Sequence, residues 1–479
     1  MPLPLRTHSY IDGAWIEGAR TFAVRNPANG AILAQVADLG ADEANAAIAA
    51  ATAALPAWSA QLAKDRAAIL RRWFALIIEH TEDLARLMTA EGGKPLAEAR
   101  GEVTYGASFI EWFAEEAKRA YGRVVPTTAA HRRYVTIQQP VGVVAAITPW
   151  NFPMAMITRK AAPALAAGCT IVLKPAEATP LTALALAELA ARAGIPPGVL
   201  NVVTTNDAAA VGKALCDSPL VRKLSFTGST AVGKLLAAQC AGTVKRLSLE
   251  LGGNAPFIVF DDADLDAAVA GVMAAKFRNA GQVCTTPNRV LVHGAVYDAF
   301  AAKLADKVRA LKVGPGDEDG VQVGPLIAPR AVDKVERLVK AALGDGAAAL
   351  TGGERHAAGA QFYAPTVLAG VAPTMAVARE EIFGPVVPLI RFADEDEAVR
   401  IANDTPYGLA AYFFAKDLAR AWRVAERLEY GMVSVNEGLM SNEVTPFGGM
   451  KESGIGREGG VEGLEEFLET KFVSFSGIT

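Results

Sequence analysis

The chain is 479 residues long, with 51% hydrophobic residues, 20% charged residues and a formal net charge of −4. That length allows about three domain-sized units and a large core, and the charge excludes the basic field that binding to nucleic acid or an anionic membrane requires. No uninterrupted apolar run reaches the roughly 18 residues needed to cross a bilayer, so we predict no membrane-spanning segment.

The first part of the chain passes from β-type to helical patterning and back. Residues 1–50 hold short β-type runs, and apolar residues at helical spacing predict helices over residues 44–55, 65–80, 82–91 and 95–120. Residues 132–139 alternate as a strand with a thin apolar line, which suits the core poorly. We expect this strand to pair outside the main sheet with the similar tail 471–475, and such strands to pair across subunits.

From residue 141 onward, strands and helices alternate. Near-continuous apolar strands separated by helices are typical of a parallel sheet covered on both faces. The first series has strands 142–148, 170–174, 199–203, 222–226 and 245–249, with helices 155–167, 180–193, 208–216 and 231–239. A second series has strands 257–260, 289–292, 386–392, 410–415 and 432–436. The sequence therefore predicts an α/β protein with two doubly wound open-sheet domains and a small β bridging element.

One cysteine stands in a glycine-hinged turn between a helical run that ends near Asn279 and a β-type run that begins at Arg289. Cys284 is placed there as a nucleophile should be, at the end of a rigid element, although a lone cysteine is more often a small apolar core residue. Gly228 and Ser229 end the fourth strand, where helix N–H groups could hold a phosphate; a plain strand-to-helix turn is the alternative.

The other cysteines and the histidines indicate no further site. The four cysteines show no CxxC pairing, and the N-terminus has no apolar core of signal-peptide length, which predicts a reduced, cytoplasmic protein. The five histidines are isolated, without the spacing of metal ligands, so we predict no metal site.

Seven motifs, in order, resemble those of the NAD(P)-dependent aldehyde dehydrogenase superfamily. They are Pro149-Trp150-Asn151-Phe152-Pro153, Lys174-Pro175-Ala176-Glu177, Phe226-Thr227-Gly228-Ser229-Thr230, Leu249-Glu250-Leu251-Gly252-Gly253, Gly281-Gln282-Val283-Cys284, Glu381-Ile382-Phe383-Gly384-Pro385 and Pro446-Phe447-Gly448-Gly449. The resemblance implies a Rossmann-like dinucleotide-binding domain over residues 1–121 and 142–251, and a catalytic domain over 252–452. Residues 122–141 and 460–479 are expected to form bridging or oligomerisation strands of a homodimer or homotetramer, because their strand patterns suit pairing across subunits.

The resemblance assigns the catalytic residues. An aldehyde cannot release hydride until a nucleophile has added to it, and Cys284 is expected to make that thiohemiacetal. The Asn151 amide and the Cys284 N–H are expected to stabilise the oxyanion, and Glu250 to activate the water that hydrolyses the thioester. Alone, Asn151 reads as a turn residue, and Glu250 as a strand-end partner of a neighbouring cation. Lys160 and Glu458 are implied on the path by which the base's proton leaves, with a surface salt bridge as the alternative.

The resemblance also places the cofactor. Lys174 and Glu177 would meet the adenosine ribose, and Ser229 the pyrophosphate; Glu381 and Phe383 would meet the nicotinamide ribose and ring. Because a carboxylate accepts two ribose hydroxyl hydrogens and repels a 2′-phosphate, Glu177 favours NAD, with NADP possible. The remaining expected cofactor contacts are Trp150, Gly228, Gly233 and Leu251.

Within this superfamily, the substrate motifs are most similar to those of succinate-semialdehyde dehydrogenases. Arg159, Arg278 and Ser441 match the residues that hold the far carboxylate there, and Phe447 is expected to contact the substrate; a structural ion pair is the alternative for each arginine. Thr286 stands where many of those enzymes carry a second cysteine. The sequence thus predicts oxidation of a semialdehyde such as succinate semialdehyde. The alternatives are glutarate or 2-oxoglutarate semialdehyde, or an uncharged aliphatic or aromatic aldehyde.

Overall fold

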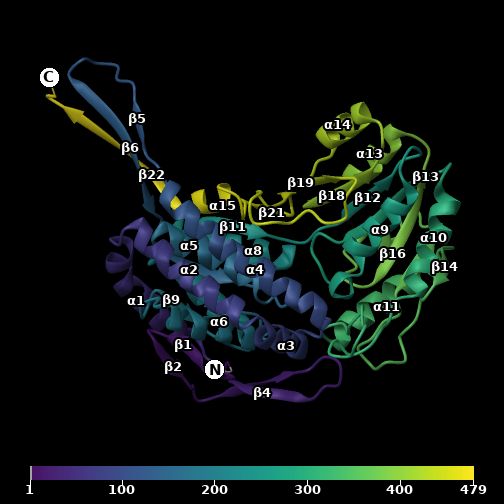
Figure 1. Ribbon diagram of the computed structural model, residues 1–479, viewed down its shortest axis with the longest axis horizontal. Coiled ribbons are helices and arrows are strands. Elements are labelled where there is room, and N and C mark those ends of the chain that lie inside the picture. The colour runs from purple at the N-terminus through teal and green to yellow at the C-terminus, as the bar shows by residue number, and fades with distance from the viewer. Residues whose placement is uncertain (1–2, 479) are drawn as a thin grey trace.

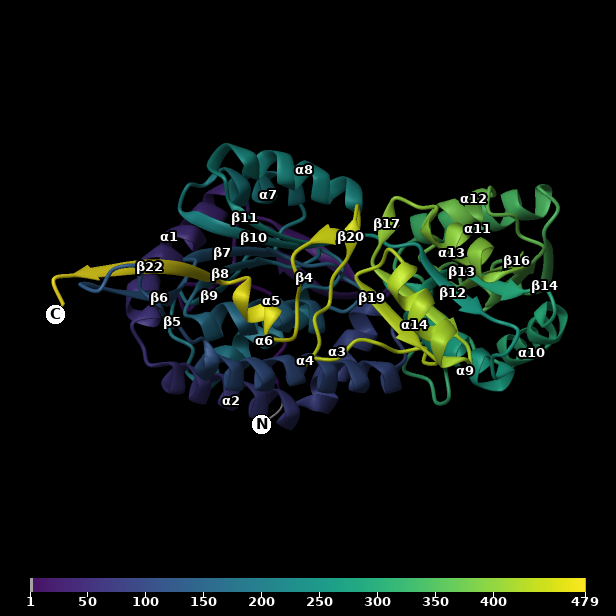
Figure 2. The same cartoon turned by 90° about the horizontal axis from the view of Figure 1, so that it is seen from above.

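A computed structural model describes residues 3–478 and confirms the predicted α/β class. Two large sheets with helices around them form the two lobes seen in Figure 1, and a small sheet extends from one end of the molecule. From above, the two lobes lie next to each other, and the small sheet projects away from the first (Figure 2).

The first sheet consists of β1 (Ser9–Ile11), β2 (Ala14–Ile16), β7 (Val143–Ile147), β8 (Thr170–Lys174), β9 (Leu200–Val202), β10 (Val221–Thr227), β11 (Arg246–Glu250) and β21 (Gly454–Ile455). Its order is β2-β1-β9-β8-β7-β10-β11-β21. Strands β7 to β11 pair in parallel, whereas β1, β2 and β21 add antiparallel edges. The chain runs outward from β7 in both directions, and such a switch opens a crevice at the carboxyl ends of the strands.

Helices α5 (Ala155–Ala167), α6 (Pro180–Ala193), α7 (Ala208–Asp217) and α8 (Thr230–Cys240) connect these strands. The first helical region supplies α1 (Ala41–Ser59), α2 (Ala63–Glu79), α3 (Thr81–Gly92) and α4 (Leu96–Glu116). All thirteen residues of α5 are buried, because its small alanines let it pack between α4 and the sheet. Gly168 ends α5 with a φ of 96°, a conformation that glycine adopts without strain, and the chain turns at once into β8.

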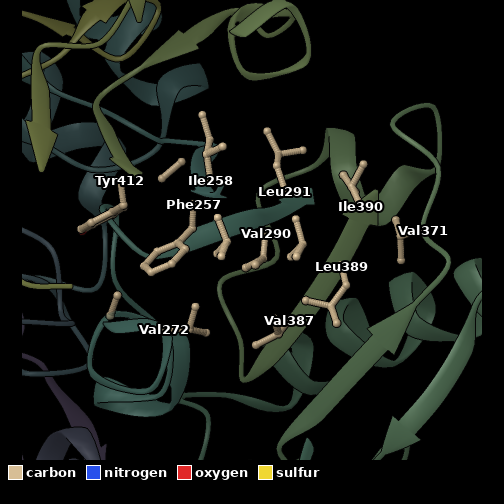
Figure 3. Packing of buried hydrophobic residues seen from close by; sticks show 14 of the residues in the cluster. Phe257, Ile258, Val272, Val290, Leu291, Val371, Val387, Leu389, Ile390 and Tyr412 are labelled. Carbon is tan, nitrogen blue, oxygen red and sulfur yellow. The ribbon is translucent and has the colours of Figure 1, made fainter. Parts of the chain in front are cut away.

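The second sheet consists of β12 (Ala255–Val259), β13 (Pro287–His293), β14 (Ala348–Thr351), β15 (Thr366–Ala369), β16 (Val386–Phe392), β18 (Ala410–Phe414) and β19 (Met432–Val435). Its order is β14-β15-β16-β13-β12-β18-β19, parallel except for β14. Helices α9 (Leu265–Lys276), α10 (Tyr297–Arg309), α11 (Pro329–Gly344), α12 (Ala376–Arg379), α13 (Glu395–Asn403) and α14 (Leu418–Arg427) surround it. Figure 3 shows its core, where Phe257, Val290 and Leu389 extend from neighbouring strands, each fully buried.

The small sheet pairs β5 (Arg123–Val125), β6 (Arg132–Pro140) and β22 (Leu468–Ser476) in the order β22-β6-β5. The register of β22 on β6 runs from Leu468 opposite Pro140 to Ser476 opposite Arg132, so the predicted pairing of the two segments is confirmed within one chain. In Figure 1 these strands form an arm that projects beyond the first lobe. Apolar side chains on this arm are exposed, among them Val124 and Phe472.

The remaining elements are β3 (Thr21–Arg25), β4 (Ile32–Ala37), β17 (Tyr407–Gly408), β20 (Met450–Lys451), α15 (Glu462–Glu465) and the 3-10 turns η1 (Ala117–Arg119), η2 (Ala241–Thr243) and η3 (Arg278–Gly281). Within residues 3–478, no helix is both long and apolar enough to cross a membrane. The same residues contain no group of three or more His, Cys, Asp or Glu side chains arranged to hold a metal ion.

Candidate active site

A cavity of about 450 Å³ lies between the two lobes. The first sheet contributes the segments that follow β7, β10 and β11, as expected for a doubly wound sheet, and the second contributes the segments that precede β13 and β16. Nine predicted site residues line it: Trp150, Asn151, Gly228, Ser229, Glu250, Leu251, Cys284, Glu381 and Phe383. Nine others lie outside its lining: Arg159, Lys160, Lys174, Glu177, Gly233, Arg278, Ser441, Phe447 and Glu458.

Cys284 follows a strained turn. The predicted helix ends earlier than expected, at Lys276, because Asn279 and Ala280 adopt left-handed conformations with φ of 49° and 55°. The carboxylate of Glu98 accepts the Asn279 N–H at 2.7 Å, which holds the first of these residues. Gly281 continues the left-handed run at φ 76°, and a Cβ there would lie 2.2 Å from a backbone oxygen, so only glycine fits. Such strain is typical of functional turns.

The Cys284 side chain is half-buried. Burial raises the pKa of its thiol to about 12. The positive charge of Arg159 favours the thiolate and opposes this shift, but it is the smaller effect. The resting side chain is therefore a neutral thiol at pH 7, and forming the thiolate requires a base or a bound ligand that changes its surroundings.

Asn151 is held by both its backbone and its side chain. Its carbonyl accepts hydrogen bonds from Lys94 Nζ and Asn279 Nδ2, each at 3.1 Å, and its own Nδ2 donates to the Gln282 carbonyl at 3.0 Å. The amide thus reaches the backbone two residues before Cys284. Since an amide nitrogen carries two hydrogens, one remains for a ligand.

Glu250 ends β11 and is only 3% exposed. Neither of its carboxyl oxygens has a hydrogen-bond partner among residues 3–478. Burial, reinforced by the nearby Glu458 carboxylate, raises the pKa of Glu250 well above 4.5. The strand-end cations of the alternative interpretation bind elsewhere: Lys245 donates to Thr243, and Arg246 pairs with Glu469.

Glu458 is equally buried but paired. Lys160 Nζ donates to one of its oxygens, and Arg159 Nη2 lies 2.7 Å from the other. Although burial alone would raise its pKa, these two cations lower the pKa of Glu458. The guanidinium of Arg159 also lies 3.8 Å from the ring centre of Phe447. The predicted pair of Lys160 and Glu458 is thus a buried ion pair, and Arg159 belongs to it.

The opposite side of the cavity has the chemistry of a nucleotide site. Ser229 Oγ caps α8 by accepting the Val232 N–H at 3.4 Å, and Gly228 and Ser229, just before the helix, line the cavity. Gly233 lies one turn into α8, where a Cβ would come within 2.4 Å of the Leu251 side chain. The buried hydroxyl of Thr227, at the end of β10, has no partner within the described chain.

Glu381 and Phe383 complete this side. The Glu381 carboxylate accepts the Gly253 N–H at 3.1 Å, and burial raises its pKa. Phe383 adopts a left-handed φ of 56°, rare for an aromatic residue, and its ring meets Trp150 edge-on at 5.7 Å. Outside the lining, Lys174 Nζ lies 3.6 Å from the half-exposed Glu177 carboxylate, and burial lowers the pKa of Lys174.

Two predicted substrate residues, Arg278 and Ser441, lie outside the cavity lining. Arg278 lies over the ring of Phe152, 5.2 Å from its centre, and its Nε is buried without a partner among the described residues. Ser441 lies in the loop after β19, and its hydroxyl contacts that of Tyr105.

Arg330 and Lys334 also line the cavity, and the sequence analysis missed both. They are four residues apart at the start of α11, so they share one face of that helix. Two cations near a helix N-terminus oppose the helix dipole, and that signal could have marked them.

Comparison with known proteins identifies the family of the chain. The model of the aldehyde dehydrogenase family matches residues 15–473. The succinate-semialdehyde dehydrogenase (NADP+) GabD of Escherichia coli is 59% identical over 470 residues, covering 98% of this chain and 97% of that protein. The glutarate-semialdehyde dehydrogenase of Pseudomonas aeruginosa is 58% identical over 475 residues, covering 99% and 98%.

A solved structure is equally similar. The crystal structure of succinate-semialdehyde dehydrogenase from Burkholderia pseudomallei superposes with a TM-score of 0.98 at 59% identity, covering 98% of each chain. A family match over nearly the whole length leaves no doubt about the assignment that the seven motifs predicted. The chain belongs to the aldehyde dehydrogenase family and is an NAD(P)-dependent oxidoreductase.

Proposed function

We propose that this protein oxidises an aldehyde bearing a carboxylate at its far end, such as succinate semialdehyde, to the free acid. The observation that carries the proposal is the set of groups around Cys284: Asn151 with a free amide hydrogen, Glu250 with an unpartnered carboxyl group, and Arg278 with an unpartnered Nε. The E. coli and P. aeruginosa relatives are named for semialdehydes that both carry such a carboxylate.

The first step is addition of the Cys284 sulfur to the aldehyde carbon. The neutral thiol must lose its proton, and the unpartnered carboxyl group of Glu250, which lines the cavity, accepts it once it is itself ionised. As the tetrahedral adduct forms, its oxygen becomes negative. The free hydrogen of Asn151 Nδ2 and the Cys284 N–H stabilise it, and each such donor contributes on the order of 100-fold in rate.

The residues across the cavity fit a nicotinamide dinucleotide. The α8 N-terminus with Ser229 would hold the pyrophosphate, Glu381 a ribose and Phe383 the ring, while Lys174 and Glu177 would meet the adenosine ribose. A nicotinamide dinucleotide held by these residues would supply the acceptor for the adduct's hydride. Glu177 is half-exposed beside Lys174, and its carboxylate would repel a 2′-phosphate, which favours NAD over NADP.

Glu250 must first release the thiol's proton, which leaves toward the buried pair of Lys160 and Glu458. As a carboxylate it then activates water against the thioester on Cys284, and the water's proton leaves by the same path. A base at this position leads to a free acid, because water rather than a thiol cosubstrate accepts the acyl group.

Arg278 is the main partner for the far carboxylate, since its guanidinium forms no salt bridge with another described residue. Arg159 is tied to Glu458, so it contributes through its remaining N–H groups. Ser441 adds a hydroxyl donor, and Phe447 packs against Arg159.

The test is the rate of NADH or NADPH formation with succinate semialdehyde, glutarate semialdehyde, propanal and benzaldehyde. We expect kcat/KM to favour the carboxylate-bearing aldehydes by about 100-fold, on the order of 3 kcal/mol. Replacing Arg278 by Leu should raise KM for succinate semialdehyde and leave KM for propanal unchanged. If propanal or benzaldehyde is preferred, the enzyme oxidises uncharged aldehydes and the arginines are structural.

Two other features bear on the assembly of the enzyme and on its cellular compartment. The exposed apolar arm of β5, β6 and β22 supports assembly into a homodimer or homotetramer, which sedimentation analysis of a Phe472→Asp variant would test. The cysteines at positions 169, 216, 240 and 284 are free thiols, which supports a reducing compartment such as the cytoplasm.

A further inference from the structure

A pair of hydroxyls lies beside the cluster that flanks Cys284. Tyr105, from the middle of α4, contacts the Ser441 hydroxyl across 336 positions of the chain. One turn further along α4, the Ser108 hydroxyl donates to Glu443 at 3.2 Å, so the same helix face holds the loop at two points. The loop that carries Ser441 is therefore positioned by α4.

Tyr105 also faces the reacting end of the site. Its ring packs against the small apolar cluster of Phe152, Ala155, Met156 and Val283. Met156 lines the cavity, Val283 precedes the nucleophile, and Phe152 lies beneath Arg278. Tyr105, Arg278, Ser441 and Cys284 are all half-buried, so each keeps part of its surface exposed.

The two hydroxyls have a hydrogen to spare. Each carries one, and only one can lie between them, whichever oxygen donates. A carboxylate accepts hydrogen bonds and donates none, so the remaining hydrogen is suited to it. Phenol hydrogens are better donors than aliphatic hydroxyl hydrogens because the phenol is more acidic.

We propose that Tyr105 is a specificity-determining residue that binds the substrate's far carboxylate together with Ser441 and Arg278. In the bound state Ser441 donates to the Tyr105 oxygen, and Tyr105 donates to a carboxylate oxygen that also faces the guanidinium. This inference rests on the proposed function, since it requires a substrate with an anionic far end. It adds Tyr105 of α4 to the residues that bind the far carboxylate.

The experiment measures kcat and KM of the full-length enzyme with NAD, using succinate semialdehyde and propanal, for wild type and for Tyr105→Phe, Ser441→Ala and the double variant. A hydrogen bond to a charged group supports an expected rise of about tenfold or more in KM for succinate semialdehyde with Tyr105→Phe. The value for propanal should stay within about twofold, because propanal has no carboxylate. The double variant should resemble the single ones, because the hydroxyls act as a unit.

Tyr412→Phe is the matched control. Its hydroxyl donates to the Thr285 carbonyl at 3.0 Å, next to the nucleophile, so its loss should affect both aldehydes alike. Binding of succinate, measured by calorimetry to wild type and Tyr105→Phe, gives a readout independent of turnover, and we expect it to weaken about tenfold.

Three outcomes separate the two proposals. If wild type favours succinate semialdehyde but Tyr105→Phe changes neither KM nor succinate binding, the role of Tyr105 is wrong and the proposed function stands. If Tyr105→Phe lowers kcat/KM equally for both aldehydes, Tyr105 is structural and the inference also fails. If wild type shows no preference for succinate semialdehyde over propanal, the proposed function and this inference both fail.

Discussion

Two buried carboxyl groups, at the end of β11 and in the segment after β21, differ in their partners and not in their depth. Glu250 is 3% exposed and Glu458 is 4% exposed. Glu250 has no hydrogen-bond partner within residues 3–478 and its pKa is raised, whereas Glu458 lies between Lys160 and Arg159 and its pKa is lowered. Burial alone therefore does not decide the charge of a carboxyl group; the cations placed against it do.

The largest effect is expected from Glu250→Gln, which keeps the shape of the protonated acid and removes the base. Steady-state kcat should fall about 10²- to 10⁴-fold. Stopped-flow and steady-state measurements of NADH with succinate semialdehyde would show which step is lost, since a remaining burst locates the defect in hydrolysis. Glu465→Gln, at an exposed position on α15, is the control. A Glu250→Gln enzyme with wild-type turnover would remove Glu250 from the mechanism.

The next effect is on stability and concerns the paired carboxyl group. Glu458→Gln leaves Lys160 and Arg159 as buried cations without their carboxylate, and breaking a buried pair from one side costs about 3 kcal/mol or more. Adding Lys160→Met should recover part of that loss, because one of the two uncompensated cations is then gone. Urea denaturation of wild type, Glu458→Gln and the double variant measures this. Equal destabilisation by the single and double variants would contradict it.

The two groups should also give opposite pH dependence of stability. The folded pKa of Glu250 is raised, so its contribution is fully present below pH 4.5 and is lost as pH rises through the folded value. The stability of Glu250→Gln relative to wild type should thus increase with pH, by about 1.4 kcal/mol for each unit of pKa shift.

Glu458 has a lowered folded pKa, so its contribution is present above pH 4.5 and is lost as pH falls through the folded value. Glu458→Gln should therefore cost most near neutral pH and less in acid. Thermal melts of both variants between about pH 2 and 9 cover both windows and measure the slopes; slopes of the same sign would show that pairing does not separate the two groups.

Local sequence patterns predicted the helices and strands well, but they did not predict which side chains pair around the two carboxyl groups. Residues 155–167, 170–174 and 180–193 were predicted with the bounds that the structure has, because their apolar spacing depends on nearby residues. The predicted helix extends to Asn279, whereas the structure ends it at Lys276, since the left-handed conformation of Asn279 depends on Glu98, which is distant in the sequence. The contact of Arg159 with Glu458 joins distant segments, so spacing alone could not reveal it.

The smallest effect extends the comparison to Glu177, a carboxylate 44% exposed with Lys174 at 3.6 Å. Water already solvates its charge, so Glu177→Gln should leave stability within about 0.5 kcal/mol. The amide no longer repels a 2′-phosphate and frees Lys174 to meet it, so the ratio of kcat/KM for NADP to that for NAD should rise about tenfold at low salt. The gain should shrink as ionic strength rises, because salt screens the interaction between exposed charges.

Glu188→Gln is the control. The Glu188 carboxylate pairs with Arg6 and Arg192 away from the cavity lining, so its replacement should leave the ratio unchanged. An unchanged ratio in Glu177→Gln would mean that the exposed carboxylate, unlike the two buried ones, does not select its ligand by charge.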